Sequence, residues 1–413
     1  MNILFLNNYH YLRGGSEQVY FGEIELLRTH GHLVHAFARK TESDFPSKYA
    51  PFFPKDIKTD SLSFGFSTFR MVKEILYSSE SKKQLEKILK KFKPDVVHAH
   101  NIYGRLTTSV LDLLYANNIP IVMTLHDYKL ICPSYKMMFN NRVCEDCKGG
   151  KYYQAVLNKC HKNSMAASAI YALETWLNDY FQKYRLNVSF FVAPSLFLKD
   201  KLVDFGWVSE QVIYIPNYIV SKVFEPNYDS KDYLLYLGRL SAEKGISTLI
   251  QAFLEVESKS IKLVIAGDGP ERGYLESISK NDNRIKFTGY LSGNELREVT
   301  RNAKAVVIPS EWYENAPISI LEAFAYGKPV IGARIGGIPE MVVDGKNGLL
   351  FESGNVRDLT AKIRDFLTLS DSRITDIGKA ARKTVEEKYN PELHYDNLFT
   401  LYQKAIDMKE GSK

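Results

Sequence analysis

The sequence predicts an α/β protein with two Rossmann-like domains, each built around a parallel sheet. The chain has 413 residues, which is long for one hydrophobic core, so two domains are expected. Short apolar segments alternate with segments of helical periodicity in both halves, and strands spaced by helices form parallel sheets. A polar stretch at residues 225–232 separates the two series. In such folds, ligands bind where strands end and helices begin.

The apolar run at the start of the chain, Met1–Leu6, is too short for a signal peptide and lacks a basic segment, so it predicts a strand. The strands predicted for the first half are Ile3–Asn7, Val34–Phe37, Val96–Ala99, Ile121–Leu125, Phe190–Ala193 and Val212–Pro216. Those predicted for the second half are Tyr233–Leu237, Leu263–Ala266, Ile285–Thr288, Ala305–Ile308 and Val330–Ala333. From about Pro391, apolar residues recur at helical spacing and predict a final helix.

Composition is that of a soluble globular protein, with 45% hydrophobic and 25% charged residues. No apolar run approaches the ~20 residues of a membrane span, and we expect a cytoplasmic protein. The net charge of +6 includes a Lys-rich segment that follows an apolar stretch at residues 62–72: Lys82, Lys83, Lys87, Lys90, Lys91 and Lys93. This segment suits contact with an anionic membrane face, or it is an ordinary exposed helix. Nucleic acid is not an expected partner, because no recognised binding motif accompanies the charge.

The stretch at residues 309–323 is the most informative part of the chain. It follows a predicted strand, and Pro317 suits the first position of the helix that comes next. The backbone N–H groups of Ile318, Ser319 and Ile320 would then be free to hold a phosphate. Glu314 precedes this helix and Glu322 lies on it. Carboxylates accept hydrogen bonds from hydroxyls, so the pair suits the hydroxyl-rich parts of a sugar nucleotide.

This stretch resembles the Glu-x7-Glu motif of retaining glycosyltransferases with the GT-B fold, and most closely that of family 4. The resemblance implies that Glu314 faces the donor sugar and that Glu322 binds the ribose. It covers nearly the whole chain and is strongest over residues 233–351. It also implies sheets that face across a cleft, with an acceptor domain at 1–220, a donor domain at 221–390 and a helix at 391–413 that crosses back to the first domain.

A second motif, from Gly238 to Gly245, resembles the family's Gly-Arg-x4-Lys-Gly loop. Arg239 and Lys244 are thereby implied to stabilise the diphosphate leaving group, where preorganised cations lower the energy of the transition state. With Glu314 and His126, they form the predicted catalytic set.

Three further glycine motifs resemble loops near the donor in the family, although each also fits a purely structural turn. Gly14 and Gly15 open a helix and would approach the diphosphate. Gly267 and Gly269 would line the base pocket. Glu340, in the Gly-Gly-Ile-Pro-Glu loop, is a candidate hydroxyl ligand.

Polar residues also end two strands of the first half. The resemblance places His126 against the donor sugar, whereas the ordinary interpretation is a satisfied core histidine. His100 and Asn101 are candidates for the acceptor side. No Asp-x-Asp triplet of metal-dependent glycosyltransferases occurs in the chain, so metal-independent transfer without a catalytic cofactor is expected.

All four cysteines fall in one window with the spacing Cys-x11-Cys-x2-Cys-x12-Cys: Cys132, Cys144, Cys147 and Cys160. In a cytoplasmic chain, this spacing favours a structural zinc knuckle, with free thiols or a redox pair as alternatives.

The sequence therefore predicts transfer of a sugar from a UDP- or GDP-linked donor to a lipid-linked or saccharide acceptor. The family's setting is polysaccharide, lipopolysaccharide or capsule assembly. The alternatives are a nucleotide-sugar epimerase of the same fold and a non-catalytic sugar-nucleotide-binding protein. The residues identify neither the base, the sugar, the acceptor, the linkage nor the oligomeric state.

Overall fold

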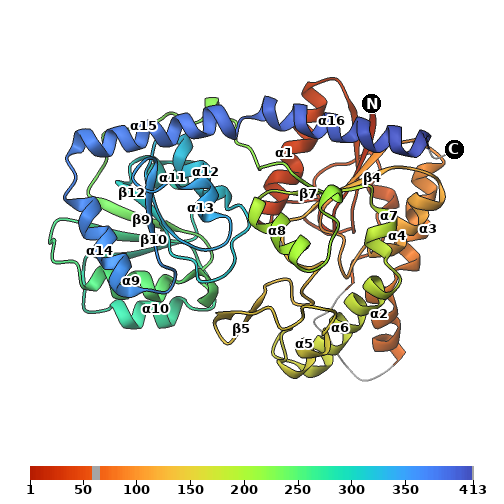
Figure 1. Cartoon of the computed structure of the whole chain (residues 1–413), viewed down its shortest axis with the longest axis horizontal. Helices are drawn as coiled ribbons and strands as arrows, with labels where there is room; N and C mark the ends of the chain where they lie inside the picture. The colour runs from red at the N-terminus through yellow and green to blue at the C-terminus, as the bar shows by residue number, and fades with distance from the viewer. Residues whose placement is uncertain (58–65, 412–413) are drawn as a thin grey trace. The chain divides into compact units, whose positions relative to one another are not determined.

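The computed structural model describes residues 1–57 and 66–411 (Figure 1). The chain divides into two compact units. The first comprises Met1–Phe139, Cys144–Ile215 and Tyr395–Lys413, and the second comprises Asn140–Val143 and Pro216–His394. Each unit contains a six-stranded parallel sheet, which confirms the predicted α/β class. No helix in the described part of the chain has the length and apolar character needed to span a membrane.

The sheet of the first unit has the order β2-β1-β3-β4-β7-β8. Its strands are β1 (Asn2–Leu6), β2 (Leu33–Phe37), β3 (Val96–Ala99), β4 (Ile121–Thr124), β7 (Phe190–Ala193) and β8 (Val212–Tyr214). The chain moves from β1 outward to β2 and then returns to the other side of β1 to form β3. The strand order therefore reverses between β1 and β3, and the loops after these strands lie where α/β proteins bind ligands.

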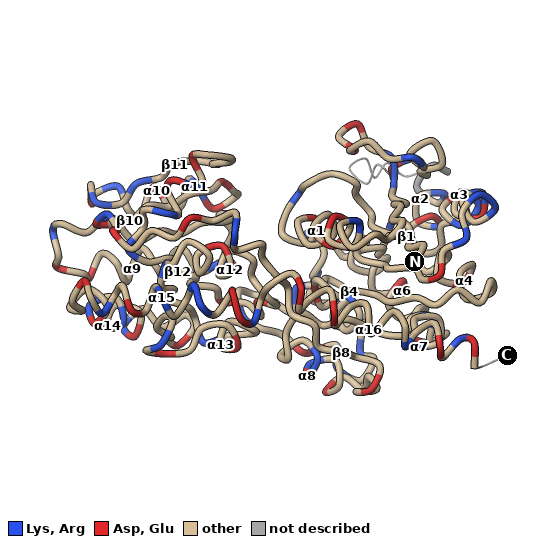
Figure 2. Tube along the Cα trace, turned by 90° about the horizontal axis from the view of Figure 1, so that it is seen from above, with Lys and Arg blue, Asp and Glu red and all other residues tan. Residues whose placement is uncertain are grey.

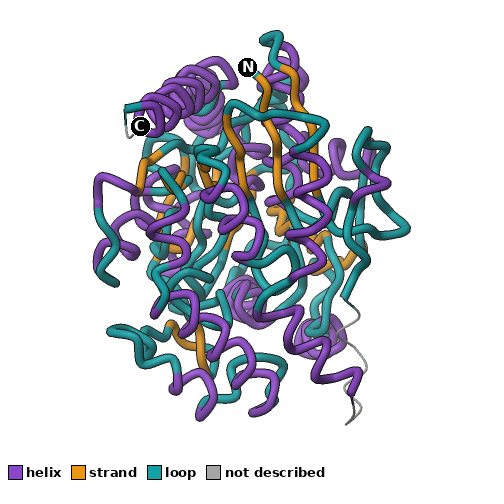
Figure 3. Tube along the Cα trace, turned by 90° about the vertical axis from the view of Figure 1, so that its right-hand side faces the viewer, coloured by secondary structure: helices purple, strands orange, loops and turns teal. Residues whose placement is uncertain are grey.

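Helices cover this sheet on both sides, as Figure 3 shows. The helices of this unit include α1 (Gly15–Thr29), α2 (Phe66–Leu76), α3 (Ser79–Leu89), α4 (Thr108–Ala116), α6 (Met165–Tyr180), α7 (Lys183–Asn187), α8 (Leu196–Asp204) and α16 (Pro391–Glu410). Serine side chains cap α3, α6 and α8 by accepting a backbone N–H in the first turn. The last helix, α16, buries Leu398, Leu401, Tyr402 and Ala405 in the same core as Ile3 and Phe5.

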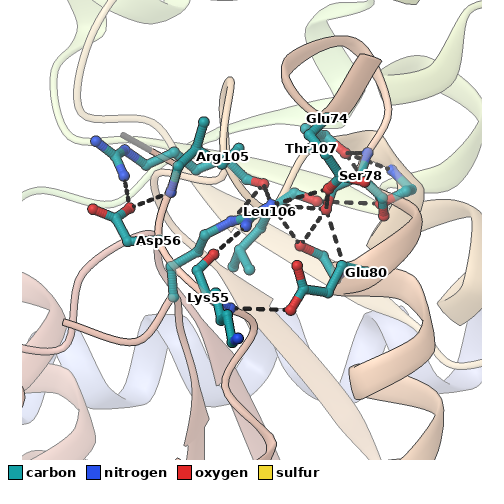
Figure 4. Close-up of polar contacts among 12 residues, drawn as sticks. Lys55, Asp56, Glu74, Ser78, Glu80, Arg105, Leu106 and Thr107 are labelled. Atoms are coloured by element: carbon teal, nitrogen blue, oxygen red, sulfur yellow. Dashed lines mark hydrogen bonds and ion pairs between the residues drawn. The ribbon is translucent and has the colours of Figure 1, made fainter. Parts of the chain in front are cut away.

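A buried arginine that the sequence analysis did not single out holds several loops of this unit together. The Arg39 side chain is 1% exposed, and its guanidinium donates hydrogen bonds to the carbonyl oxygens of Lys55 and Arg105 and to Ser78 Oγ. Glu74 lies 3.5 Å away and provides a counter-charge. Figure 4 shows the surrounding contacts, which tie the loop after β2 to α2, α3 and the loop before α4.

The sheet of the second unit has the order β11-β10-β9-β12-β13-β14. Its strands are β9 (Tyr233–Leu237), β10 (Lys262–Ala266), β11 (Ile285–Gly289), β12 (Ala305–Ile308), β13 (Val330–Ala333) and β14 (Gly348–Phe351). Its helices are α9 (Ile246–Leu254), α10 (Arg272–Ser279), α11 (Gly293–Arg301), α12 (Ile318–Ala325), α13 (Ile338–Met341), α14 (Val356–Leu367) and α15 (Asp371–Lys388). Here the strand order reverses between β9 and β12, so the loops after these two strands form the expected ligand site.

Candidate donor site and histidine cluster

The loops after β9 and β12 carry an ion pair at the switch point of the second sheet. Lys244 Nζ lies 2.7 Å from Glu314 Oε1, and Ser310 Oγ donates to the same oxygen at 2.6 Å. The two loops are also joined through the backbone, because the Glu311 N–H donates to the carbonyl oxygen of Glu243 at 3.0 Å. The fold thus brings together two of the residues predicted for catalysis, which are 70 positions apart in the chain.

Glu314 is held in its ionised form although it is buried. Its residue is only 6% exposed, and burial alone would raise the pKa of the carboxyl. The positive charge of Lys244, with hydrogen bonds from Lys244 and Ser310, outweighs burial and lowers the Glu314 pKa below its usual range. The Lys244 ammonium also lies 4.9 Å from the centre of the Trp312 ring, a cation–π contact. The loop therefore holds a fixed carboxylate and a fixed, partly exposed cation.

The N-terminus of α12 differs from the prediction in two ways. Pro317 is the N-cap rather than the first helical residue, because its ψ of 118° is extended. The Ile320 N–H is not free either, since it donates to the Pro317 carbonyl oxygen at 3.1 Å in a tight first turn. The N–H groups of Ile318 and Ser319 have no hydrogen-bond partner among the described residues. Two N–H groups, rather than three, are thus available to an anion at this helix end.

Glu322 lies further along α12 and is only partly exposed. Burial raises the pKa of its carboxyl to about 7. Within the described part of the chain, its oxygens have no hydrogen-bond or ion-pair partner. An unpaired, half-buried carboxyl with no structural contact is suited to accept hydrogen bonds from a ligand.

Arg239 lies on the same loop as Lys244 but is exposed and has no ionic partner among the described residues. No ion pair or hydrogen bond joins it to Glu314 or Glu322. Glu340 lies in the short helix α13, whose first turn includes a bond from the Glu340 N–H to the Gly337 carbonyl oxygen at 3.2 Å. Their predicted roles toward a donor remain predictions.

Glycines allow the loops of this site to touch through their backbones. A Cβ on Gly245, whose φ is +67°, would lie 1.9 Å from the carbonyl oxygen of Pro309. A Cβ on Gly267 would lie 1.9 Å from the Gly238 carbonyl oxygen, and one on Gly269 would lie 2.2 Å from that of Leu240. Side chains at these positions would push the β9, β10 and β12 loops apart. The structure thus gives Gly267 and Gly269 a packing role beside the base-binding role predicted for them.

The first unit contains a separate cluster of histidines, also at its switch point. His100, at the end of β3, places Nδ1 2.8 Å from His126 Nε2 beyond β4, and places Nε2 3.2 Å from Glu23 Oε2 of α1. Glu23 and His100 are fully buried. Burial, followed by the neighbouring His100, lowers the His126 pKa to about 3, so His126 is neutral at physiological pH.

The His100 Nε2 atom is at ion-pair distance from Glu23 but makes no hydrogen bond among the described residues. The contact between His100 Nδ1 and His126 Nε2 needs one ring to donate and the other to accept, and either direction satisfies it. Sequence reasoning missed Glu23, because it lies on a helix far from both histidines and only the fold reveals the contact.

The other residues predicted for a site in the first unit lie on the loops that follow β1 and β3. The Asn101 N–H donates to Asn7 Oδ1 at 3.1 Å, and its carbonyl oxygen accepts the Asn8 N–H at 2.7 Å. Asn101 Oδ1 is buried without a hydrogen-bond partner among the described residues. Gly14 and Gly15 are exposed at the start of α1, and the Gly14 φ of −172° is ordinary extended backbone.

Comparison with known proteins identifies the family. A model of glycosyltransferase family 4 matches residues 13–221, which is more than half of the chain, and a model of glycosyl transferases group 1 matches residues 221–384. The chain belongs to glycosyltransferase family 4. The predicted family is therefore confirmed, and the two matched regions meet at residue 221.

Curated relatives include transferases with different stated donors or products. Sulfoquinovosyl transferase SQD2 of Arabidopsis thaliana is 26% identical over 315 residues, which cover 72% of this chain and 54% of that protein. A GDP-mannose-dependent alpha-mannosyltransferase of Corynebacterium glutamicum is 32% identical over 231 residues, which cover 52% of this chain and 54% of that protein. The matches thus span about half the length of these relatives.

Solved structures of other proteins share the fold over nearly the whole chain. Sucrose-phosphate synthase from Thermosynechococcus elongatus has a TM-score of 0.70 at 19% identity, covering 98% of this chain and 99% of that one. Anabaena Alr3699/HepE in complex with UDP and glucose has a TM-score of 0.67 at 18% identity, covering 98% and 100%. This likeness confirms the GT-B fold that family 4 implies.

Proposed function

We propose that the chain is a retaining, metal-independent glycosyltransferase that moves a sugar from a UDP- or GDP-linked donor to an acceptor hydroxyl. The observation that carries this proposal is the Lys244–Glu314 pair at the switch point of the second sheet. It lies on the loops that lead to α12, where the Ile318 and Ser319 N–H groups and the Glu322 carboxyl have no partner among the described residues. The cation and the free N–H groups suit a diphosphate, and the free carboxylate suits the hydroxyls of the sugars that the diphosphate joins.

In this assignment, the donor diphosphate takes the α12 N-terminus, where unpaired N–H groups and the helix dipole favour negative charge. Glu322 accepts hydrogen bonds from the ribose, and Glu314 accepts them from the donor sugar. Gly14, Gly15, Gly267, Gly269 and Glu340 are proposed to complete the donor pocket. Relatives of this fold bind UDP, and one named relative uses GDP-mannose, which supports either base.

Arg239 and Lys244 would stabilise the negative charge that the leaving diphosphate gains as the glycosidic bond breaks. The acceptor oxygen forms its bond on the face that the diphosphate leaves, and its proton passes to a departing phosphate oxygen. The products are a glycoside of retained configuration and a free nucleoside diphosphate. Neutral His126 would orient the donor sugar through its ring Nδ1, with His100 and Asn101 toward the acceptor.

The acceptor is proposed to be a lipid-linked or free saccharide, at the cytoplasmic face of a cell membrane. Surface polysaccharide, lipopolysaccharide or capsule assembly would use such a reaction. An epimerase of this fold would consume the donor without glycosylating an acceptor, so analysis of the products separates the two activities.

A thermal-shift panel tests the donor site. UDP, GDP, ADP and their common sugars are compared on the wild type, on Glu322→Ala and on Glu257→Ala, a control at an exposed carboxylate in the same unit. A ligand that binds only the folded state stabilises it by ~2.7 kcal/mol at a hundredfold excess over Kd. We expect one nucleotide to shift the wild type and the control but not Glu322→Ala. If no nucleotide or nucleotide sugar raises the melting temperature of the wild type, the donor assignment fails. A protein without transferase activity then becomes the better interpretation.

A further inference from the structure

The segment between β4 and α6 folds with little regular structure. Its elements are β5 (Met138–Phe139), β6 (Arg142–Val143) and α5 (Tyr153–Leu157), of two to five residues each. It contains seven of the ten non-glycine residues with positive φ in the described part of the chain: Tyr135, Met137, Asn140, Asn141, Lys159, Lys162 and Asn163. L-residues avoid this backbone region, so the segment needs constraints that its own secondary structure does not supply.

Both ends of the segment are fixed to α6. Lys129 Nζ lies 2.7 Å from Glu174 Oε2, with both side chains buried, and also donates to the Pro133 carbonyl oxygen at 3.1 Å. The His161 N–H donates to Ser168 Oγ at 3.0 Å. The residues between these anchors depend on other contacts, and there the cysteines lie.

All four cysteines of the chain line one small cavity inside this segment, with Ile131, Met137 and Ala155 among its apolar walls. Backbone hydrogen bonds fix three of them. The N–H groups of Cys132, Cys144 and Cys160 donate to the carbonyl oxygens of Tyr128, Met137 and Ala155 at 2.8, 2.8 and 3.0 Å. These cysteines are up to 28 residues apart in the chain, yet all of them line one cavity. Cysteines without a shared role would not be expected to converge in this way.

We propose that Cys132, Cys144, Cys147 and Cys160 bind one structural Zn²⁺ ion in this cavity. Four soft sulfur ligands match tetrahedral zinc, and a closed shell of four protein ligands assigns the ion a structural role. All four thiols are free, and each loses its proton to solvent when the ion binds. This site goes beyond the proposed transfer reaction and does not depend on it.

Neighbouring polar groups are already committed to other contacts, which favours a purely cysteine site. The His161 ring packs against Tyr171, with centroids 4.1 Å apart, and does not line the cavity. Glu145 pairs with Lys201 at 2.6 Å, and Asp146 accepts from Asn158 at 3.3 Å. The four thiols are thus the groups best placed to hold the ion.

Among the described residues, one group has metal-ligand atoms within 4.8 Å of one another, namely Glu23, His98 and His100, and it contains no cysteine. Both ring nitrogens of His98 are occupied there, by Tyr402 Oη at 2.6 Å and Thr124 Oγ1 at 2.8 Å, so that group is a hydrogen-bond network. The cysteine sulfurs do not meet this distance in threes, so binding one ion requires them to draw closer. Cys144, Cys147 and Cys160 are only partly buried.

The wild-type protein, purified after growth with zinc and without chelator, provides the first test. Elemental analysis is expected to give about one zinc per chain, released when an organomercurial blocks the thiols. Replacement by Co²⁺ should give the visible bands and thiolate charge-transfer absorption of a tetrahedral tetrathiolate site. These measurements need no variant, so they stand even if a variant fails to fold.

Matched variants then separate the ligand sets. Cys147→Ser and Cys160→Ser are expected to lower bound zinc at least tenfold, whereas His161→Gln should keep it. Zinc lost in His161→Gln but kept in a cysteine variant would overturn the proposal. So would a wild-type protein that contains no zinc and takes up neither zinc nor cobalt after mild reduction, or one whose cysteines form disulfides.

Discussion

The proposed donor site contains one buried carboxylate and the cation that keeps it ionised. Lys244→Met leaves Glu314 buried without its counter-charge. We expect the free energy of unfolding to fall by roughly 1–3 kcal/mol, because an unpaired buried charged group must be desolvated. We expect turnover to fall about a hundredfold or more, as when a preorganised electrostatic contact to a leaving group is lost. Denaturant unfolding and steady-state kinetics measure the two effects.

The double variant Lys244→Met/Glu314→Gln is the control for this pair. Removing both charges should restore most of the stability, because a neutral pair is easier to bury than an unpaired charge. It should not restore turnover. Full activity in Lys244→Met would exclude the leaving-group role, and equal stability of the single and double variants would contradict the ion-pair argument.

If Glu322 binds the donor as proposed, donor binding should depend on pH. Its folded-state pKa of about 7 is above its ordinary value, so the folded state binds this proton more tightly than the unfolded state. Its contribution to stability therefore decreases as pH rises from about 4.5 to about 7.

Ligand hydroxyls, in contrast, donate to the ionised carboxylate. We expect nucleotide affinity to rise roughly tenfold between pH 6 and pH 8 in titration calorimetry. Glu322→Gln should show no such rise, and a flat wild-type profile would contradict the ribose assignment.

At the scale of the elements, glycines let the β9 and β12 loops meet. Gly245→Ala would place a Cβ 1.9 Å from the Pro309 carbonyl oxygen at a φ of +67°. We expect a loss of roughly 2–4 kcal/mol in unfolding free energy, from overpacking and backbone strain together. Gly273→Ala is the control, since it lies in α10 with nothing within 4 Å of the added Cβ, and should be neutral or stabilising. Thermal unfolding that ranks the two variants equally would contradict this account.

Periodicity was sufficient to predict the elements that lie deepest in the sheets. The predicted ranges for β3, β7, β9, β12 and β13 agree with the structure, because buried parallel strands are continuous apolar runs between turn residues. β14 was missed, because a four-residue strand that begins with Gly348 cannot be distinguished from a loop by pattern alone. The helix α12 begins at Ile318, one residue later than predicted, because the sequence does not reveal whether a proline is the N-cap or the first residue of a helix.

The candidate site was only partly predictable. Motif spacing identified Lys244 and Glu314, but not that they form an ion pair, because the pairing arises from two adjacent strands. Glu23 and Arg39 were missed entirely. Both are buried charged residues whose partners come from distant parts of the chain, and no local pattern marks such a residue.

For the molecule as a whole, each sheet places its candidate residues at its own switch point. The first unit also exposes aromatic side chains and a lysine-rich helix. Phe69 of α2 is 71% exposed, and the neighbouring α6 exposes Trp176 and Tyr180. Lysines are concentrated on α3, as Figure 2 shows. Interfacial aromatic residues beside cations favour anionic lipid surfaces.

We expect the protein to sediment with vesicles containing anionic phospholipid, and less so as salt rises. Trp176→Ser and the pair Lys87→Glu/Lys91→Glu should weaken this binding, by about fivefold for each lysine lost. Tyr290→Ser, at an aromatic residue that is 79% exposed in the second unit, should not. Equal binding to neutral and anionic vesicles would contradict the charge argument.

The most direct test of the central claim follows donor consumption by proton NMR. Water can take the place of the acceptor hydroxyl in the proposed reaction, so the experiment needs no knowledge of the acceptor. The nucleotide sugar chosen by thermal shift is mixed with enzyme, and the anomeric signal of the first released sugar is recorded before mutarotation. The account predicts nucleoside diphosphate and a sugar of retained configuration from the wild type, and neither from Lys244→Met. A sugar of inverted configuration would contradict the retaining mechanism, and an epimerised donor with no free nucleoside diphosphate would contradict transfer itself.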